Sequence, residues 1–204
     1  MKAVMMQRDE AIKMQEWQEI KEWGKFSMGK MYRILQTYGS KVEWRNLQYN
    51  NNAKPRSKFM FWMACHERLA TKDRLCKFGF VKDTKCGFCV KDESVNHLFF
   101  ECESLKKVWK EVLAWIQINH SPGDWNDERN WLVQNTKGKG SCAAIIKMAA
   151  TETIYALWKY RNARILGDDI DIDKVRKDII DTLVYKGWEN KKLRNHIAIL
   201  MLED

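Results

Sequence analysis

The chain has 204 residues, of which 45% are hydrophobic, so its length and composition suit one folded domain or two small ones and exclude a disordered chain. Its formal net charge is +9 and its sequence pI is near 9.2, which favours polyanionic partners. The sequence shows no secretory signal and no apolar run of transmembrane length. We therefore expect an intracellular protein without a membrane partner, in the nucleus rather than the cytoplasm, with an organelle as the remaining alternative.

Helical patterns follow one another along the chain. Apolar residues three and four apart, or runs of helix-forming residues, predict helices over 3–23, 27–38, 59–69, 72–78, 105–116, 126–133 and 141–166, and one helix or a pair over 171–202. The segment 59–69 is apolar on nearly all sides and is predicted to be buried. No run of alternating polar and apolar residues indicates a strand, so the predicted fold is mainly α.

Glycines and short polar side chains mark the predicted helix ends. Thr71 and Asp171 are placed to act as N-caps, because a side-chain oxygen there can accept the free amide hydrogens of the first turn. Gly39, Gly79 and Gly167 each follow a predicted helix, and glycine readily takes the left-handed conformation that ends one.

Four residues that commonly bind metals follow the helix at 72–78. Cys86, Cys89, His97 and Cys102 form the pattern C-x2-C-x7-H-x4-C, and Gly87 lets the first turn close so that amides point at sulfur. Tetrahedral zinc takes four thiolate or imidazole ligands. His97 and Cys102 are five residues apart, so the segment either begins a helix whose register bends around the metal or places Cys102 at its end. Four protein ligands leave no position for a water nucleophile, so we predict one structural zinc ion.

Two other interpretations of this segment stay open. The cysteines can be ordinary buried thiols beside a hydrogen-bonded histidine, or the C-x2-C pair can be a redox couple. The downstream histidine and cysteine at ligand spacing favour zinc over both. The other cysteines, of which Cys76 is the first substitute ligand, are predicted to lie in the core, and the other histidines to bind no metal. These residues are Cys65, Cys76, Cys142, His66, His120 and His196.

Several stretches around the motif occur together in one known family. They are KPRSKFMFWMA from Lys54, HERLATKDRL from His66, the C-x2-C pair, HLFFEC from His97, and the pair Val108 and Trp109. With them, residues 54–118 resemble the zinc-binding domain that follows the reverse transcriptase in plant LINE-type (non-LTR) retrotransposon polyproteins. Residues 26–32 and 154–162 resemble the segments that precede and follow this domain there.

The resemblance implies zinc binding at the four positions that the spacing also indicates, in a chain that carries the domain without the polymerase. The fold expected is a helical bundle with a small CCHC zinc knuckle inserted between helices. Its predicted parts are an N-terminal helical segment (1–25), a reverse-transcriptase-type zinc-binding domain (26–118), a loop (119–140) and C-terminal helices that pack on the domain (141–204). The sequence leaves open whether the chain is a host protein derived from a retroelement or a retroelement fragment.

No catalytic constellation accompanies this domain. The predicted helices leave no room for a polymerase palm or an endonuclease. Asp168 and Asp169 resemble polymerase aspartates only in isolation, because such a pair needs a β-hairpin and a third carboxylate to hold two metals. Here they follow Gly167 and precede the predicted cap Asp171, as in a loop. We therefore expect no enzyme activity and no small-molecule substrate.

Positive charge is concentrated around the cysteine motif, where residues 54–111 hold 13 Lys and Arg against 8 Asp and Glu. The first functional hypothesis is therefore a zinc module that binds RNA or DNA. Its candidate contacts are Lys54, Arg56, Lys58, Arg68, Lys72, Arg74, Lys77 and Lys85, with Lys82 and Lys91 beside the knuckle. Phe88 either stacks on an unpaired base or, as we favour, packs beneath the metal. The lysines are equally consistent with a solvated face.

The second hypothesis is a protein-interaction subunit of a host assembly, in which zinc is purely structural. A helical chain with ten tryptophans has more aromatic surface than one core needs. Exposed aromatic side chains mark interfaces. The candidates outside the zinc segment are Trp17, Trp23, Trp125, Trp131 and Trp188.

Overall fold

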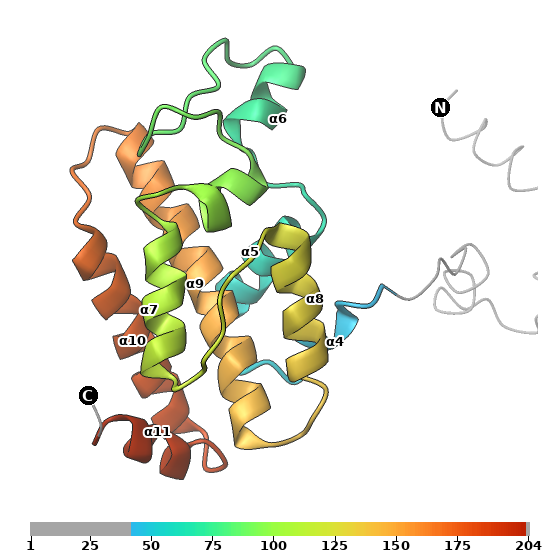
Figure 1. Ribbon diagram of the computed structural model, residues 1–204, viewed down its shortest axis with the longest axis vertical. Helices are drawn as coiled ribbons and strands as arrows, with labels where there is room; N and C mark the ends of the chain where they lie inside the picture. The colour runs from blue at the N-terminus through green and yellow to red at the C-terminus, as the bar shows by residue number, and fades with distance from the viewer. Residues whose placement is uncertain (1–41, 203–204) are drawn as a thin grey trace, which may run out of the picture. The chain divides into compact units, whose positions relative to one another are not determined.

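Helices make up most of the computed structural model, which describes residues 42–202 (Figure 1). In chain order they are α4 (Arg45–Gln48), α5 (Pro55–Cys65), α6 (Lys72–Lys77), the π-helical turn η1 (His97–Glu101), α7 (Lys106–Trp115), α8 (Trp125–Asn135), α9 (Ser141–Ile165), α10 (Ile172–Glu189) and α11 (Arg194–Leu200). Within 42–202 no strand forms, and an isolated β-bridge joins Lys85 to Asp92. The predicted mainly α class is confirmed.

The long helix α9 runs through the middle of the bundle, with α7 and α10 on one side and α5 and α8 on the other (Figure 1). Nearly every side chain from 143 to 158 is buried, including Thr151, Glu152 and Thr153. A helix that is covered on all sides belongs to the core, so its polar side chains need partners within the protein. No helix within 42–202, α9 included, combines the length and apolar character that a bilayer crossing requires.

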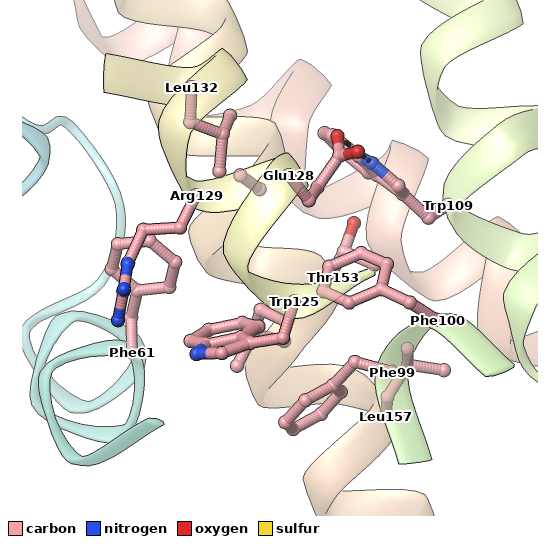
Figure 2. Close-up of a pocket in the computed structure, with 12 residues that line it drawn as sticks. Phe61, Phe99, Phe100, Trp109, Trp125, Glu128, Arg129, Leu132, Thr153 and Leu157 are labelled. Atoms are coloured by element: carbon pink, nitrogen blue, oxygen red, sulfur yellow. Dashed lines mark hydrogen bonds between the residues drawn. The ribbon is translucent and has the colours of Figure 1, made fainter. Parts of the chain in front are cut away.

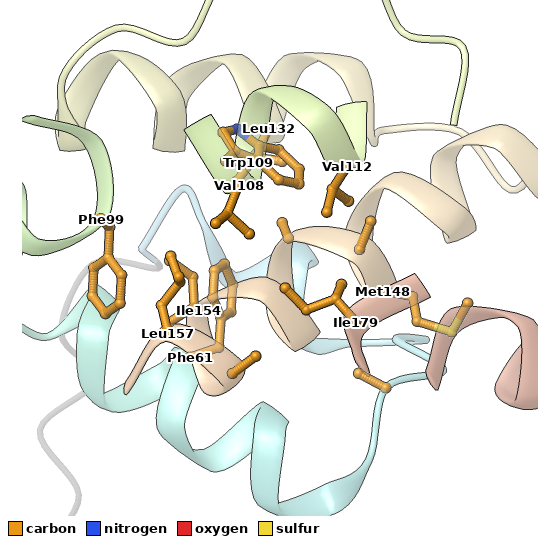
Figure 3. Close-up of a cluster of buried hydrophobic side chains, with 14 of the residues drawn as sticks. Phe61, Phe99, Val108, Trp109, Val112, Leu132, Met148, Ile154, Leu157 and Ile179 are labelled. Carbon is orange, nitrogen blue, oxygen red and sulfur yellow. The ribbon is translucent and has the colours of Figure 1, made fainter. Parts of the chain in front are cut away.

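The hydrophobic core forms where α5, α7 and α10 meet α9 (Figure 3). Its side chains come from these helices, from η1 and from α8, and those labelled in the figure are at most 4% exposed: Phe61, Phe99, Val108, Trp109, Val112, Leu132, Met148, Ile154, Leu157 and Ile179. Burying one such side chain contributes roughly 1.5–3 kcal/mol, so this cluster is the main source of the bundle's stability. The apolar stripes predicted on α7 and α10 both contribute to it.

The buried carboxylate of Glu152, a residue of α9, accepts hydrogen bonds at the N-terminus of α5. Glu152 Oε1 accepts the backbone N–H of Lys54 at 2.7 Å, and Glu152 Oε2 accepts the Ser57 hydroxyl at 2.8 Å. The free amides at a helix N-terminus carry partial positive charge, which stabilises a negative group placed there. Glu152 thus joins two helices that are far apart in the sequence.

Most of the predicted helix-end signals that lie in the described residues are confirmed. Asp171 accepts hydrogen bonds from two amides in the first turn of α10, as predicted. Gly79 and Gly167 have φ angles of +75° and +100°, which confirms them as helix ends. The prediction for Thr71 is wrong, because its side chain caps nothing. A long-range partner replaces it: Glu93 Oε1 accepts the N–H of the first residue of α6 at 2.8 Å.

Three segments differ in their limits from the prediction. The helix predicted over 59–69 is α5, which ends at Cys65 and is not wholly buried, because Phe59 is 58% exposed. The loop predicted over 119–140 contains α8, which extends the helical piece predicted at 126–133 at both ends. The last region is a pair, α10 and α11. The helices predicted at 3–23 and 27–38, and Gly39, lie outside the described residues.

Candidate metal centre

The four predicted ligands come together beside the C-terminal end of α9. Cys86 and Cys89 lie in the loop between α6 and η1, His97 is the first residue of η1, and Cys102 directly follows it. Their three sulfur atoms and one ring nitrogen all lie within 4.8 Å of one another. Three of the side chains are buried and that of Cys89 is half-buried. The group can hold a metal ion.

Two distances show that the group has the size of a tetrahedral zinc site. The Sγ atoms of Cys86 and Cys102 are 4.0 Å apart, and Cys89 Sγ lies 3.1 Å from His97 Nε2. With Zn–S near 2.3 Å and Zn–N near 2.0–2.1 Å, a tetrahedron has sulfur–sulfur edges of about 3.8 Å and sulfur–nitrogen edges of about 3.5 Å. The donor set and its dimensions therefore fit zinc.

The turn η1 accounts for the five-residue step from His97 to Cys102. The N–H of Cys102 donates to the carbonyl of His97 at 2.7 Å. This π-helical hydrogen bond, one residue longer than that of an α-helix, brings both side chains to the same side of the segment. Each alternative drawn from the spacing is partly right, because the helical register widens at the site and Cys102 ends the turn.

Hydrogen bonds within the group polarise two of its thiols. The N–H of Phe88 donates to Cys86 Sγ at 3.4 Å. A hydrogen bond from the Cys102 thiol, assisted by the Phe88 amide, outweighs the effect of burial and lowers the pKa of Cys86 to about 5. The same pairing, with burial, raises the pKa of Cys102. Cysteine binds a metal as the thiolate, so metal binding to this pair is coupled to proton release.

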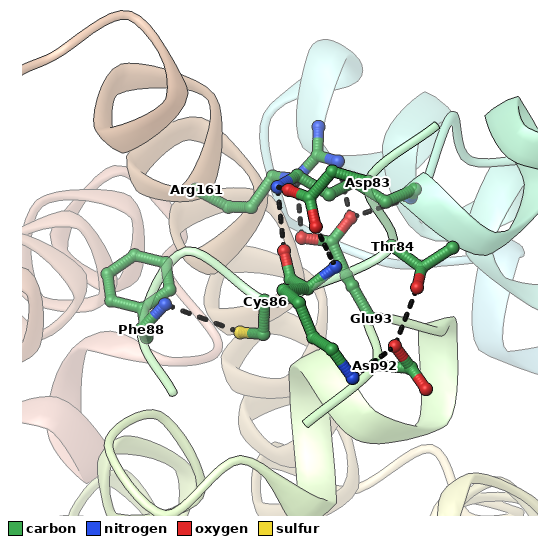
Figure 4. A network of polar contacts seen from close by, with 9 residues as sticks. Asp83, Thr84, Cys86, Phe88, Asp92, Glu93 and Arg161 are labelled. Atoms are coloured by element: carbon green, nitrogen blue, oxygen red, sulfur yellow. Dashed lines mark hydrogen bonds and ion pairs between the residues drawn. The ribbon is translucent and has the colours of Figure 1, made fainter. Parts of the chain in front are cut away.

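A buried ion pair attaches the cysteine loop to α9 (Figure 4). Arg161 Nε donates to Glu93 Oε2 at 3.0 Å, and Arg161 Nη2 donates to Glu93 Oε1. The two side chains are 5% and 0% exposed. The guanidinium also lies over the ring of Trp158 and donates to Asn162, so its remaining polar atoms are not left without partners. The sequence analysis missed both members of the pair, although Arg161 lies in the stretch 154–162 that resembles the family.

The N-terminus of α6 is bonded to the same loop. Glu93 accepts the backbone N–H of Lys72 through Oε1 at 2.8 Å and that of Asp73 through its carbonyl at 3.2 Å. Lys72 Nζ donates to the carbonyl of Lys85 at 2.6 Å and to Asp83 Oδ2 at 2.8 Å. The chain on both sides of the C-x2-C pair therefore holds α6 in position.

Gly87 lies in a turn whose amide points at sulfur, as predicted, because the N–H of Phe88 donates to Cys86 Sγ. Its φ is outside the left-handed region, which in the described chain is occupied by Gly79 and Gly167 among the glycines. A Cβ atom at Gly87 would lie 3.4 Å from Arg164 Cγ, and Arg164 Nε donates to the Gly87 carbonyl at 3.4 Å. The loop thus contacts α9 at Gly87, through the side chain of Arg164.

The basic residues predicted to contact nucleic acid fall into two groups relative to α5. Three lie at the N-terminal end of α5 and five lie beyond its C-terminal end, around α6 and the cysteine loop; they are Lys54, Arg56 and Lys58, then Arg68, Lys72, Arg74, Lys77 and Lys85. Since α5 has 11 residues, its length of about 16 Å lies between the groups. In the second group, Lys85 directly precedes Cys86 and Lys72 is bonded to the cysteine loop.

Several of these side chains are bound within the protein. Lys54 and Lys58 form long hydrogen bonds of 3.3 and 3.4 Å through Nζ. Lys72 and Lys85 form ion pairs of 2.8 and 3.0 Å, and Arg74 donates to the Glu67 carbonyl at 3.0 Å. Within 42–202, no ion pair or hydrogen bond holds the side chains of Arg56, Arg68 and Lys77.

The remaining cysteines do not share one environment. Cys65 is buried in α5, as predicted, and burial raises its pKa to about 12. The prediction that Cys76 and Cys142 lie in the core is wrong, because both are exposed. Cys76 belongs to α6, a short peripheral helix with no buried residue. It is not part of the metal-binding group found within 42–202.

The remaining histidines have partners elsewhere. His120 Nε2 lies 2.9 Å from Glu128 Oε2, and its ring stacks on a tryptophan of α8. His196 Nδ1 lies 3.0 Å from the hydroxyl oxygen of Ser141. His66 packs edge-on against two tryptophan rings. Among the described residues, these histidines stand apart from the metal-binding group.

The aromatic candidates are redistributed by the fold. Phe88 is half-buried against the core, in agreement with the interpretation that we favoured. Trp125 is 4% exposed and Trp131 is half-buried, so the prediction that they form exposed surface is wrong. Trp188 is 42% exposed. Trp17 and Trp23 lie outside the described residues.

An aromatic pocket between α5, α8 and α9 is part of the core (Figure 2). The rings of Phe61, Phe100 and Trp125 line it, and Glu128 accepts the indole N–H of Trp109 at 2.8 Å beside it. Its free volume of about 10 Å³ is at most that of one water molecule. This space is too small to make the pocket a site for an organic ligand.

Fold and site together define a helical protein with three cysteines and a histidine arranged to hold a metal ion. Residues 26–109 match a family model described as zinc-binding in reverse transcriptase, and the matched stretch contains all four candidate ligands. This match confirms the resemblance to a zinc-binding domain of reverse transcriptases over those residues. The match ends within α7. Glu152 and Arg161, the residues of α9 that bind α5 and the cysteine loop, therefore lie beyond it. No curated protein and no solved structure matches the chain.

Proposed function

We propose that the chain is a non-catalytic zinc-binding module, derived from a plant LINE-type retrotransposon reverse transcriptase, that binds RNA or DNA through a basic surface. One structural zinc ion is bound by Cys86, Cys89, His97 and Cys102. The observation that carries the proposal is the convergence of these four donor atoms within 4.8 Å. Four protein ligands leave no position for a water nucleophile, which supports a structural role over a catalytic one.

Charge around the knuckle supports nucleic acid as the partner. Residues 66–91 hold seven Lys and Arg against three Asp and Glu, and Arg68 and Lys77 are not bound to other groups in the described chain. Cationic side chains that neutralise phosphates release counterions, so the affinity of such a surface falls steeply with salt.

The bonds around Glu93 link the metal site to this surface. Glu93 and Lys85 lie on the cysteine loop and bind Lys72 at the start of α6, while Arg74 and Lys77 lie on α6 itself. A bound zinc ion therefore stabilises the position of the basic side chains, and removal of the metal weakens nucleic-acid binding.

The experiment titrates labelled single-stranded RNA and duplex DNA with the zinc-loaded full chain at two salt concentrations. We expect binding that weakens steeply with salt, and a several-fold loss of affinity when Arg68 and Lys77 are both replaced by alanine. Replacing Lys191 and Lys192, which are exposed between α10 and α11, removes the same charge elsewhere and leaves affinity nearly unchanged. Failure to bind either nucleic acid at low salt contradicts the proposal.

A second candidate function, protein interaction, rests on the opposite end of the bundle (Figure 1). Large apolar side chains are exposed on and after α10 and α11: Tyr185, Trp188, Ile199, Met201 and Leu202. Exposed apolar clusters mark interfaces. The test is co-purification from native tissue: a stable partner that is lost with Ile199→Asp, while nucleic-acid binding is unaffected, supports this function.

A further inference from the structure

Two exposed phenylalanines follow α6 and serve neither the core nor the metal site. Phe78 is 63% exposed and Phe80 is 75% exposed. They are separated by Gly79 at the C-terminal end of the helix. Aromatic rings left in solvent within one short segment indicate a contact surface rather than a contribution to folding.

The backbone holds these two residues in defined positions. The N–H of Gly79 donates to the Cys76 carbonyl at 2.9 Å, and the N–H of Phe80 donates to the Leu75 carbonyl at 3.0 Å. This pair of bonds, with φ of +75° at Gly79, is the Schellman motif. The side chain at the position of Phe80 often packs back on the helix in such motifs, but here it remains largely in solvent.

Cationic side chains lie beside Phe78. The guanidinium of Arg74 lies over the Phe78 ring, 5.3 Å from its centroid. Arg74, Lys77 and Phe78 line an open cleft of about 390 Å³ between α6, the segment before η1 and the start of α8. Three acidic residues, Glu67, Asp73 and Asp124, line it too, and Asp124 accepts amide hydrogens at the N-terminus of α8. Over 66–82, five Lys and Arg stand against two acidic residues.

We propose that this surface binds single-stranded nucleic acid, with bases stacked on Phe78 and Phe80 and phosphates bound by Arg74 and Lys77. The inference rests on the proposed function and specifies the form of the nucleic acid and the residues that select it. An unpaired base offers a free π-face to an aromatic ring, whereas the faces of bases in a duplex are covered by their neighbours. Stacking tolerates any base, so RNA and DNA single strands are both accepted.

The test compares affinities of the zinc-loaded full chain for labelled single-stranded RNA and DNA of about 12 nucleotides, and for a duplex of the same sequence. In the double variant Phe78→Ala/Phe80→Ala, we expect single-strand affinity to fall by about five-fold or more for each ring, with duplex affinity nearly unchanged. Phe59→Ala is the matched control, because this phenylalanine on α5 is 58% exposed, and its affinity should equal that of the wild type. Zinc content and helicity check the fold of each variant.

The outcomes separate this inference from the proposed function. Unchanged single-strand affinity in the double variant, while the wild type still binds in a salt-dependent manner, overturns the inference alone. Equal losses for single strand and duplex also overturn it, because stacking on unpaired bases acts on the single strand only. If the wild type binds no nucleic acid, the inference and the proposed function are both overturned. The same holds if it binds no nucleic acid and these rings bind a protein instead.

Discussion

The helical core and the cysteine loop of this chain are stabilised in different ways. In the core, α5, α7, α9 and α10 bury a large set of apolar side chains together. From 80 to 94 no helix forms, and the buried residues there are Cys86 and Glu93. So little apolar burial does not offset the conformational entropy of ordering such a segment. If the loop binds zinc as we propose, it depends on that ion and on a few polar bonds, and we expect it to lose its structure while the bundle persists.

The largest effect is expected from loss of the metal. We expect about one zinc ion per chain in the wild type and none retained in Cys102→Ala, because this buried thiol is one of four ligands. Apparent binding free energies of structural zinc are about 10–16 kcal/mol in small zinc-binding peptides. Metal analysis and hydrogen exchange are the measurements: amides of 82–105 should lose protection while those of α9 and α10 keep it.

Two controls accompany this prediction. Cys142→Ala removes an exposed thiol and should keep its zinc. A thiol reagent should modify Cys76 and Cys142 in the zinc-bound protein, the three cysteine ligands only after chelation, and Cys65 only after unfolding. Full zinc occupancy in Cys102→Ala would contradict the assigned ligand set.

Breaking the link between the two regions should have the next largest effect. Arg161→Met leaves the Glu93 carboxylate buried without its partner, and removing one member of a buried pair costs about 3–5 kcal/mol. The matched control is Arg176→Met on α10, whose ion pair with Glu111 is partly exposed and should contribute at most about 1 kcal/mol. Urea unfolding measures both. Equal losses for the two variants would show that the buried pair has no special role.

A cavity in the core should lower stability without affecting the metal. Leu157 is 1% exposed in α9, and Leu157→Ala should reduce the free energy of unfolding by about 2–5 kcal/mol. Zinc content should remain at the wild-type level, because Leu157 belongs to the apolar cluster and is not one of the four ligands. Leu166→Ala, at an 84% exposed position, is the control and should change little. Release of zinc by Leu157→Ala would show that the two regions are not separable.

The last effect appears only at alkaline pH. Burial raises the pKa of Cys65 from 9.0 to about 12, so the folded state favours the neutral thiol. Its contribution to stability is fully present below pH 9 and is lost as pH rises towards 12, because the unfolded chain loses the proton first. Through this group the free energy of unfolding changes by at most about 1.4 kcal/mol per pH unit. Unfolding curves of the wild type and Cys65→Ala should converge in this range, whereas those of Cys142→Ala should stay parallel to the wild type.

The sequence predicted what depends on local spacing. Apolar residues three and four apart located α7 and α10, and the separations of Cys86, Cys89, His97 and Cys102 identified the residues that the structure brings together. The five-residue step to Cys102 even indicated an irregular register, which is the π-turn η1. These signals are available because each partner lies within a few residues of the next.

Contacts between distant segments could not be predicted in this way. Arg161 and Glu93 are 68 residues apart, and Glu152 and Ser57 are 95 apart, so no local period connects them. Composition was misleading for Cys76, because a thiol that packs well in a core is exposed on a helix with no buried face. Arg161 lay in the resembling stretch 154–162. It follows Leu157 by four residues and Trp158 by three, so a basic residue on the predicted apolar face of this helix was the signal that could have revealed it.

X-ray absorption at the zinc edge tests the central claim most directly, because it reports the atoms bound to the metal in the intact protein. The account predicts three sulfur atoms at about 2.3 Å and one imidazole nitrogen at about 2.0–2.1 Å, with about one zinc ion per chain. A shell made mainly of oxygen atoms, or protein purified without added metal that contains no zinc, would contradict it.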